Sequence, residues 1–109
     1  MNYEWNPAKN LENIKKHKVG FEQAAIALED PYRLYFYDES HSRNEDRYIV
    51  LANAKGRILF VSIVLVDEDT TRIISARRAN RNEMEAYDEN CSLFFGKRTE
   101  TCQERLGQA

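Results

Sequence analysis

Residues that mark specialised chemistry are scarce in this 109-residue sequence, which has four glycines, two prolines and two cysteines. It contains no glycine-rich phosphate loop, no paired-cysteine motif and no serine or cysteine nucleophile signature, so most familiar enzyme classes are excluded. Ten residues separate Cys91 from Cys102, a spacing that matches neither a disulfide framework nor a zinc site. We therefore expect reduced thiols and no metal.

An excess of positive charge is also missing. Sixteen Lys and Arg residues against eighteen Asp and Glu residues give a net charge of −2, so any site for a polyanion has to be a local cluster. The longest apolar run, residues 58–66, is interrupted by Ser62 and is far shorter than the roughly 20 residues of a membrane span. With no basic and apolar leader at the N-terminus, we expect a cytoplasmic protein that makes no use of a membrane.

The length and the 42% hydrophobic content are typical of one domain, which we place at residues 1–89. Residues 90–109 lack a clear period and are expected to form a partly ordered or partner-binding tail. Hydrophobic periodicity and turn residues predict a short N-terminal strand, two helices over residues 7–17 and 21–29, strands at residues 32–37, 47–52, 57–66 and 72–78, and a last helix from Asn80.

The details of these elements predict how they pack. Asn6 and Pro7 are typical of a helix start, and Ala8, Leu11 and Ile14 then predict the buried face of that helix. Short turns between consecutive strands predict antiparallel pairing, with the doubly apolar strand 57–66 in the centre. The fold class is thus α+β, with the helices grouped on one face of the sheet and the other face left for a site.

The first candidate site lies between two of these strands. His41, Arg43, Glu45 and Arg47 alternate with other residues and would share one face if the segment is extended. An imidazole, a carboxylate and guanidinium groups are the parts needed to cleave RNA through its own 2′-hydroxyl. The alternative is a solvated loop with surface ion pairs.

A second cluster is rich in arginine, the side chain that binds phosphate with two parallel hydrogen bonds. Strict alternation would place Arg72 and Arg78 on one side of the strand and Arg77 on the other, unless a bulge intervenes. The alternative is ion pairing with the acidic residues Asp67, Glu68, Glu83 or Glu85.

The third cluster is a cationic strip on the first helix that could bind a phosphate backbone without reading bases. Its members are Lys9, Lys15, Lys16, His17 and Lys18. The alternative is the solvated face of an amphipathic helix. Trp5, Phe21 and Tyr87 are better interpreted as core residues.

Many of these residues also carry a resemblance. The sequence is similar to the BrnT family of toxins at Trp5, Lys9, Asn13, Lys16, His17, Val19, Phe21, Ala24, His41, Glu45, Arg47, the segment 72–79, Glu83 and Tyr87. The match runs over most of the chain, and Arg-Ile-Ile-Ser-Ala-Arg followed by Glu and Tyr is its most specific part.

The resemblance implies a RelE-like fold and an endoribonuclease that arrests translation without a metal or a cofactor. It also implies a BrnA-like antitoxin, typically of the ribbon-helix-helix type, which neutralises the toxin and through which the complex reaches operator DNA. The implied catalytic positions are His41, Glu45, Arg47, Arg72 and Arg77, and the implied RNA contacts are Lys9, Lys16, His17 and Arg78.

Two other functions remain open at this stage. A degenerate toxin would keep the antitoxin and help to repress an operon without cleaving RNA. A structural or adaptor domain unrelated to toxins would have no small DNA-binding gene beside its own.

Overall fold

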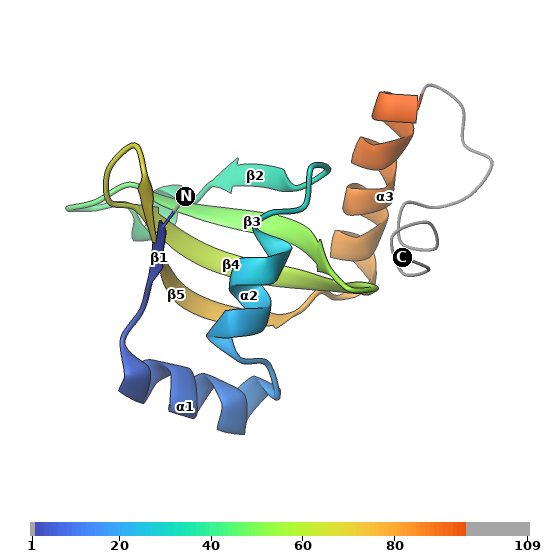
Figure 1. Ribbon diagram of the computed structural model, residues 1–109. Coiled ribbons are helices and arrows are strands. Elements are labelled where there is room, and N and C mark those ends of the chain that lie inside the picture. Colours follow the sequence, from blue (N-terminus) through green and yellow to red (C-terminus); the bar gives the residue numbers. More distant parts are fainter. Residues whose placement is uncertain (1, 96–109) are drawn as a thin grey trace.

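The computed structural model describes the backbone of residues 2–95 and the side chains of residues 2–90 (Figure 1). Its elements are, in chain order, β1 (Asn2–Glu4), α1 (Pro7–His17), α2 (Phe21–Ala27), β2 (Leu34–Tyr37), the 3₁₀ turn η1 (Glu39–His41), β3 (Arg47–Ala54), β4 (Arg57–Leu65), β5 (Thr70–Arg78) and α3 (Arg81–Phe95). The predicted α+β class and the order of elements are confirmed. No helix in the described range is long and apolar enough to cross a membrane.

The five strands form one sheet in the order β1-β5-β4-β3-β2. Strands β2 to β5 pair antiparallel, as predicted, and the apolar β4 lies in the centre. β1 pairs parallel to β5 over Thr70–Arg72. The hairpin between β3 and β4 turns through Lys55 and Gly56, whose φ angles of 53° and 93° suit the twist of the flanking strands.

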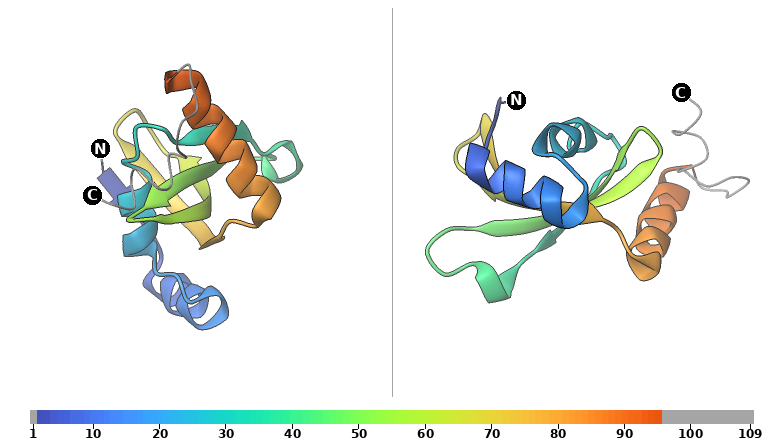
Figure 2. Two further views of the ribbon diagram at one scale, coloured as in Figure 1. Left: turned by 90° about the vertical axis from the view of Figure 1, so that its right-hand side faces the viewer. Right: turned by 90° about the horizontal axis from the view of Figure 1, so that it is seen from below.

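Each face of the sheet carries its own hydrophobic cluster. Helices α2 and α3 lie on different sides of the sheet (Figure 2). On one face, Phe21 and Ala24 of α2 pack against alternate residues of β3, β4 and β5. On the other face, Tyr87 of α3 packs against Leu51 and Ile58. The prediction that all helices lie on one face is therefore wrong, because α3 covers one end of the second face.

Helix α1 contacts the sheet through a polar residue. Its Asn13 is 7% exposed, donates to the backbone oxygen of Ala76 (2.7 Å) and accepts from the backbone N–H of Ala76 (3.2 Å). The predicted buried face is wrong, since Leu11 is 62% and Ile14 40% exposed. The reason lies in the sheet: β1 pairs with β5 only as far as Arg72, so further along this edge the backbone of β5 needs another hydrogen-bonding partner.

Both predicted helix starts are confirmed. The Asn6 side chain accepts from the backbone N–H of Ala8 at 2.9 Å. At α3, Asn80 and Glu83 each accept from the backbone N–H of the other, at 2.9 and 2.8 Å. α3 continues past the predicted boundary at Asn90 to Phe95. The rest of the predicted tail, residues 96–109, lies outside the described residues, as do the side chains of both cysteines.

Strand β5 contains a bulge that alters its alternation. Ile73 lies opposite Ile63 and Ser75 opposite Ser62, so Ile74 is an extra residue between two consecutive pairs. Ile73 and Ala76 are consequently both buried in the same cluster, although regular alternation would place residues three positions apart on opposite faces.

Candidate functional site

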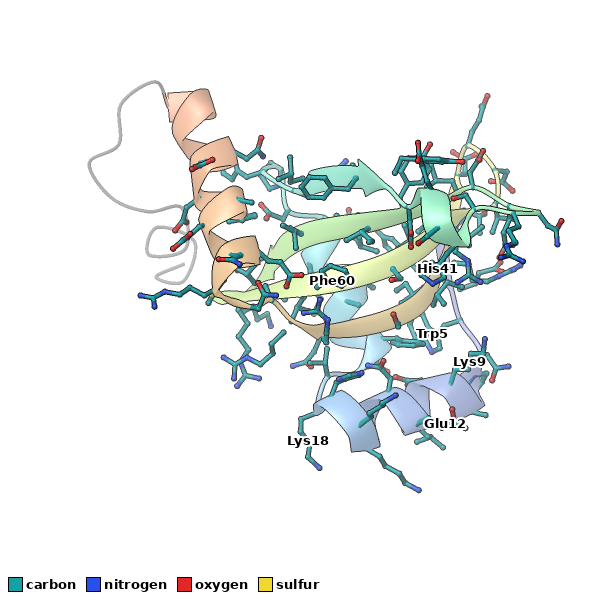
Figure 3. All side chains as sticks on the ribbon, turned by 180° about the vertical axis from the view of Figure 1, so that it is seen from behind. Trp5, Lys9, Glu12, Lys18, His41 and Phe60 are labelled. Carbon is teal, nitrogen blue, oxygen red and sulfur yellow. The ribbon has the colours of Figure 1, made fainter. Side chains whose placement is uncertain are left out.

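The face of the sheet opposite α2, which we call the open face, holds most of the polar residues of interest. Residues opposite each other on paired strands point to the same face, so the register defines three rows across it. These rows are Arg47–Val64–Arg72, Ile49–Ser62–Ser75 and Leu51–Phe60–Arg77. In Figure 3, which looks onto this face, α3 lies at one end, η1 at the other and α1 along one edge.

The bulge in β5 decides which arginines the open face receives. Because Ile74 is an extra residue, Arg72 and Arg77 point to the same face, whereas Arg78 pairs with Leu59 and points to the opposite one. The bulge that the sequence left open as the exception to strict alternation is therefore present in this strand. Of the candidate arginines in β3 and β5, the open face holds Arg47, Arg72 and Arg77.

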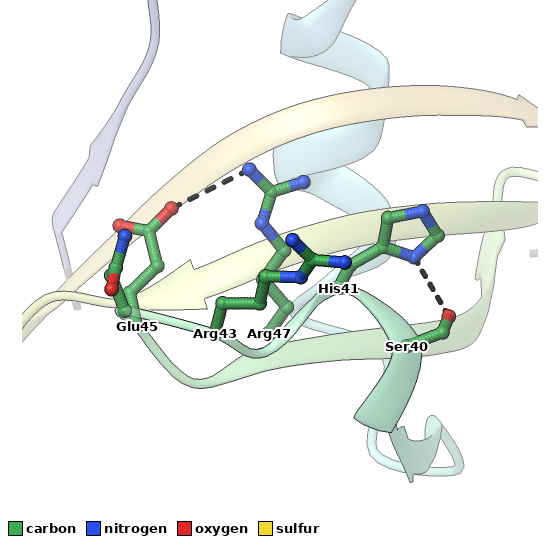
Figure 4. A pocket seen from close by; sticks show the side chains of 6 residues that line it. Ser40, His41, Arg43, Glu45 and Arg47 are labelled. Carbon is green, nitrogen blue, oxygen red and sulfur yellow. Dashed lines mark hydrogen bonds and ion pairs between the residues drawn. The ribbon is translucent and has the colours of Figure 1, made fainter.

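The segment between β2 and β3 is not extended, so the condition under which alternation would place these residues on one face is not met. It turns through η1 and a loop fixed by Ser42, whose hydroxyl donates to the backbone oxygen of Asp38 (2.7 Å) and accepts from the backbone N–H of Arg47 (2.9 Å). This loop nevertheless brings the predicted residues together around one cavity of about 650 Å³, the loop cavity (Figure 4). It is lined by Ser40, His41, Arg43, Asn44, Glu45 and Arg47.

Contacts with described residues hold His41 at one ring nitrogen, Nδ1. Its Nδ1 lies 3.0 Å from Asp38 Oδ2 and 3.1 Å from Ser40 Oγ, and its side chain is 65% exposed. The hydrogen bond from the imidazole, with a second from the Ser40 hydroxyl, holds the pKa of Asp38 below its usual value. Such an anchor fixes the ring orientation and leaves Nε2 to exchange protons with a ligand. Asp38 was missed in the sequence, although an acidic residue three positions before a histidine at a turn was the available signal.

Arg47 is weakly engaged. Its Nη2 lies 3.5 Å from Glu45 Oε1, and its buried Nε has no hydrogen-bonding partner among the described residues. A guanidinium with unused donors beside an imidazole and a carboxylate is able to bind a phosphate.

Arg77 and Arg72 are held more firmly. Arg77 donates from Nη1 and Nη2 to the two carboxylate oxygens of Glu83, both at 2.9 Å, and its Cζ lies 3.9 Å from the centroid of the Phe60 ring. Partial burial alone would raise the pKa of Glu83, but the hydrogen bonds from Arg77 and from the backbone N–H of Asn80 outweigh it and lower that pKa. Arg72 Nε donates to Glu4 at 2.8 Å. The alternative of ion pairing is therefore confirmed for Arg77 with Glu83.

The structure does not bring Arg77 to the loop cavity. Arg47 is level with Val64 and Arg77 with Phe60, so about 13 Å separates the two arginines along the strands at about 3.3 Å per residue. Arg77 also turns toward α3. Arg47 belongs with His41 and Glu45, whereas Arg77 belongs to a second part of the open face.

Part of the cationic strip of α1 lines a groove of about 240 Å³ between α1 and the bulge of β5. We call it the helix groove. It is lined by Lys9, Glu12, Asn13, Lys16, His17, Ile74 and Ser75. Because Ser75 also belongs to the open face, the cations of α1 border that face. Ser62 and Ser75, which lie opposite each other between Arg72 and Arg77, were not predicted as site residues.

A third hollow, of about 300 Å³, lies in the corner between the open face and the first turns of α3. We call it the corner pocket, and it is lined by Phe36, Ile49, Leu51, Phe60, Asn82, Glu83 and Ala86. Phe36 is 44% exposed. No sequence motif indicates this pocket, because cross-strand register and the placement of α3 create it. Among the described residues, no group of three His, Cys, Asp or Glu is placed to hold a metal ion.

Comparison with known proteins identifies the family. Residues 5–83 match the family model described as the ribonuclease toxin BrnT of type II toxin–antitoxin systems. The 1.1 Å crystal structure of the Brucella abortus ribonuclease toxin BrnT has the same fold, with a TM-score of 0.58 and 23% sequence identity over 74% of this chain and 99% of that one. A comparison with the sequences of curated proteins gives no match. Since the family model covers most of the chain, including the loop cavity and both arginines of β5 on the open face, the chain belongs to the BrnT family of ribonuclease toxins of type II toxin–antitoxin systems.

Proposed function

We propose that the loop cavity is the catalytic centre of a metal-independent endoribonuclease that cleaves cellular RNA and thereby inhibits translation. One observation carries this assignment: His41, Glu45 and Arg47 line a single cavity, and Asp38 anchors the imidazole through its Nδ1. The 2′-hydroxyl of RNA is tethered beside its own phosphate, so positioning comes largely from the substrate. The protein has to supply proton transfer and stabilisation of the developing charge.

The individual roles follow from the contacts. His41 exchanges protons through Nε2, and Glu45 is the second candidate for that role. Arg47 binds the scissile phosphate, with Arg72 beside it across the buried Val64. Arg77 binds a neighbouring phosphate on the open face, because its contacts with Glu83 and with the Arg78 carbonyl occupy three of its five N–H donors.

The remaining cations extend the path for the RNA. Lys9, Lys16 and His17 contact the phosphate backbone where the helix groove meets the open face. Arg78 lies on the opposite face, so it contributes to RNA binding only through long-range electrostatic attraction of the phosphates. With a net charge of −2, affinity depends on these local clusters.

The protein acts in the cytoplasm together with a cognate antitoxin. We propose a BrnA-like partner of the ribbon-helix-helix type that neutralises the toxin and binds operator DNA, so that the toxin reaches DNA only through its partner. No membrane is involved.

The test combines growth and cleavage. Induced expression of the chain alone should arrest growth, and co-expression with the adjacent gene should restore growth and yield a co-purified complex. The purified toxin should cleave RNA in the presence of EDTA, leaving 2′,3′-cyclic phosphate ends. Loss of cleavage in EDTA would contradict metal independence, and failure of both rescue and co-purification would contradict the assigned partner.

A second candidate function is favoured by one observation, the pairing of Arg77, Arg72 and His41 with carboxylates. In this alternative the chain is an inactive homologue that binds the antitoxin and helps to repress the operon. It predicts that expression without the partner leaves growth and RNA unchanged.

A further inference from the structure

We propose that the corner pocket binds one nucleobase of a single-stranded RNA whose adjacent phosphate is held by Arg77. This inference rests on the proposed function, since it assigns a substrate contact to the same open face. Arg77 and Glu83 are already singled out by the sequence, whereas the pocket residues Phe36, Phe60 and Asn82 are not.

The pocket and the arginine are parts of one arrangement. Phe60 lines the pocket and lies under the Arg77 guanidinium at 3.9 Å, and Glu83 lines the pocket and pairs with the same guanidinium. A phosphate bound at the remaining donors of Arg77 would therefore lie at the rim of the corner pocket. In RNA the ribose joins each base to its phosphate, so a base can enter the pocket while the phosphate of the same nucleotide stays at the rim.

The pocket walls suit a base. Ile49 and Leu51 form an apolar floor, and Phe36 offers an exposed aromatic ring, whereas Phe60 is already covered by Arg77. Stacking on an aromatic ring is available to every base, because each has a π face. A hollow of about 300 Å³ is at the lower end of the size range for small-ligand sites, which fits a single planar ring system.

The rim supplies the means to distinguish bases. Asn82, an exposed residue in the first turn of α3, carries both a donor and an acceptor. The Glu83 carboxylate is neutralised by Arg77, so the rim does not repel an anionic ligand. An RNA base with a neighbouring phosphate matches this combination of ring, amide and cation better than an apolar protein side chain does.

The experiment measures binding of short 2′-O-methyl RNA, which cannot be cleaved by attack of the 2′-oxygen. A series of such RNAs carries one abasic nucleotide at each position in turn. The wild-type toxin should lose about 10-fold in Kd at one or two positions, and Phe36→Ala should weaken binding of the intact RNA by about 10-fold while abolishing the abasic penalty. Asn82→Ala, on an exposed helix turn, should change the preferred base at that position while the abasic RNA binds as it does to wild type.

Tyr35→Ala is the matched control. Tyr35 is adjacent to Phe36 and similarly exposed, at 40%, but its cross-strand partner Val50 belongs to the α2 side of the sheet. This variant should bind every RNA of the series as wild type does.

Three results would overturn the inference. An unchanged abasic penalty in Phe36→Ala would show that no base occupies the pocket. Loss of antitoxin binding by Phe36→Ala with unchanged RNA binding would identify a protein-docking site instead. Absence of any RNA binding by the wild-type protein would remove the proposed function as well, and so differs from failure of the pocket alone.

Discussion

Asn13 forms hydrogen bonds with both backbone polar groups of Ala76, a residue 63 positions later in the chain. The same side chain donates to the backbone oxygen of Val19 at 2.8 Å. One amide thus joins α1, the turn that follows it and the unpaired edge of β5. This relationship places the lysines of the helix groove beside the open face.

Asn13→Ala should lower the free energy of unfolding by about 1–3 kcal/mol, because it leaves buried backbone groups of Ala76 and Val19 without partners. Urea unfolding followed by circular dichroism would measure the loss. Leu11→Ala on the same helix is the control and should stay within about 0.5 kcal/mol, since Leu11 is 62% exposed. A larger loss for Leu11→Ala than for Asn13→Ala would contradict this account of how α1 docks.

Tyr87→Phe should also destabilise the fold by about 1–3 kcal/mol. The buried Tyr87 hydroxyl donates to Asp30 at 2.5 Å, and burial together with this carboxylate raises the pKa of Tyr87. Asp30 also accepts from the backbone N–H groups of Tyr32 and Asn53. The hydrogen bond from Tyr87 therefore connects α3 to the segment before β2 and to β3. Tyr35→Phe, which loses an exposed hydroxyl, should have little effect in the same denaturation experiment.

Glu83→Gln should reduce stability at neutral pH but not in acid. The folded-state pKa of Glu83 is lowered, so its contribution is fully present above the unfolded value of about 4.3 and is lost as the pH falls through the folded pKa. Glutamine still caps α3, which isolates the ion pair with Arg77. Unfolding curves of both proteins between pH 7 and pH 3 should therefore converge at the acidic end, and a constant difference would refute the assignment.

Arg77→Ala should weaken binding of RNA, raising KM for cleavage more than it lowers kcat, and should weaken growth arrest while the fold stays intact, because Arg77 holds a phosphate next to the scissile one and lies away from the loop cavity. The comparison variant is Arg57→Ala, an exposed arginine at the β3–β4 hairpin, which should bind and cleave RNA as wild type does. An unchanged KM for RNA in Arg77→Ala would show that this guanidinium does not contact the substrate.

His41→Ala should lower the cleavage rate by about 10²–10⁴, the usual contribution of a positioned proton-transfer group. Asp38→Asn removes the anionic anchor that orients the imidazole, and we expect it to reduce kcat with a smaller change in KM. Single-turnover kinetics from pH 5 to pH 9 would show both effects. If Glu45→Gln is more damaging than His41→Ala, the two proton-transfer roles have to be exchanged.

Local sequence signals predicted the local structure well. The cap at Asn6, the helix start at Asn80 and the central position of β4 each depend on neighbouring residues, and all are confirmed. The buried face of α1 was predicted wrongly because two hydrogen bonds to a strand edge outweighed the burial of Leu11 and Ile14. That preference depends on where β1 stops pairing, which the helix sequence does not contain.

The candidate site was predictable only in part. Four residues expected to share a surface do line the loop cavity, but a turn fixed by Ser42 brings them there, and strand alternation does not. The shared face of Arg72 and Arg77 depends on one extra residue in β5, and the corner pocket depends on the register of three strands. Such long-range geometry produces no local sequence pattern from which it could be predicted.

The bulge at Ile74 gives the strand one residue more than its pairing requires. A chain without Ile74 would return to regular pleating with Arg72 and Arg77 still on the same side, so the two cations tolerate a deletion at this position. The wall of the helix groove does not tolerate this deletion, because Ile74 is the extra residue and lines the groove beside α1. Evolution can therefore reshape the border between helix and sheet by changing the length of β5 here, without reversing the orientation of either guanidinium.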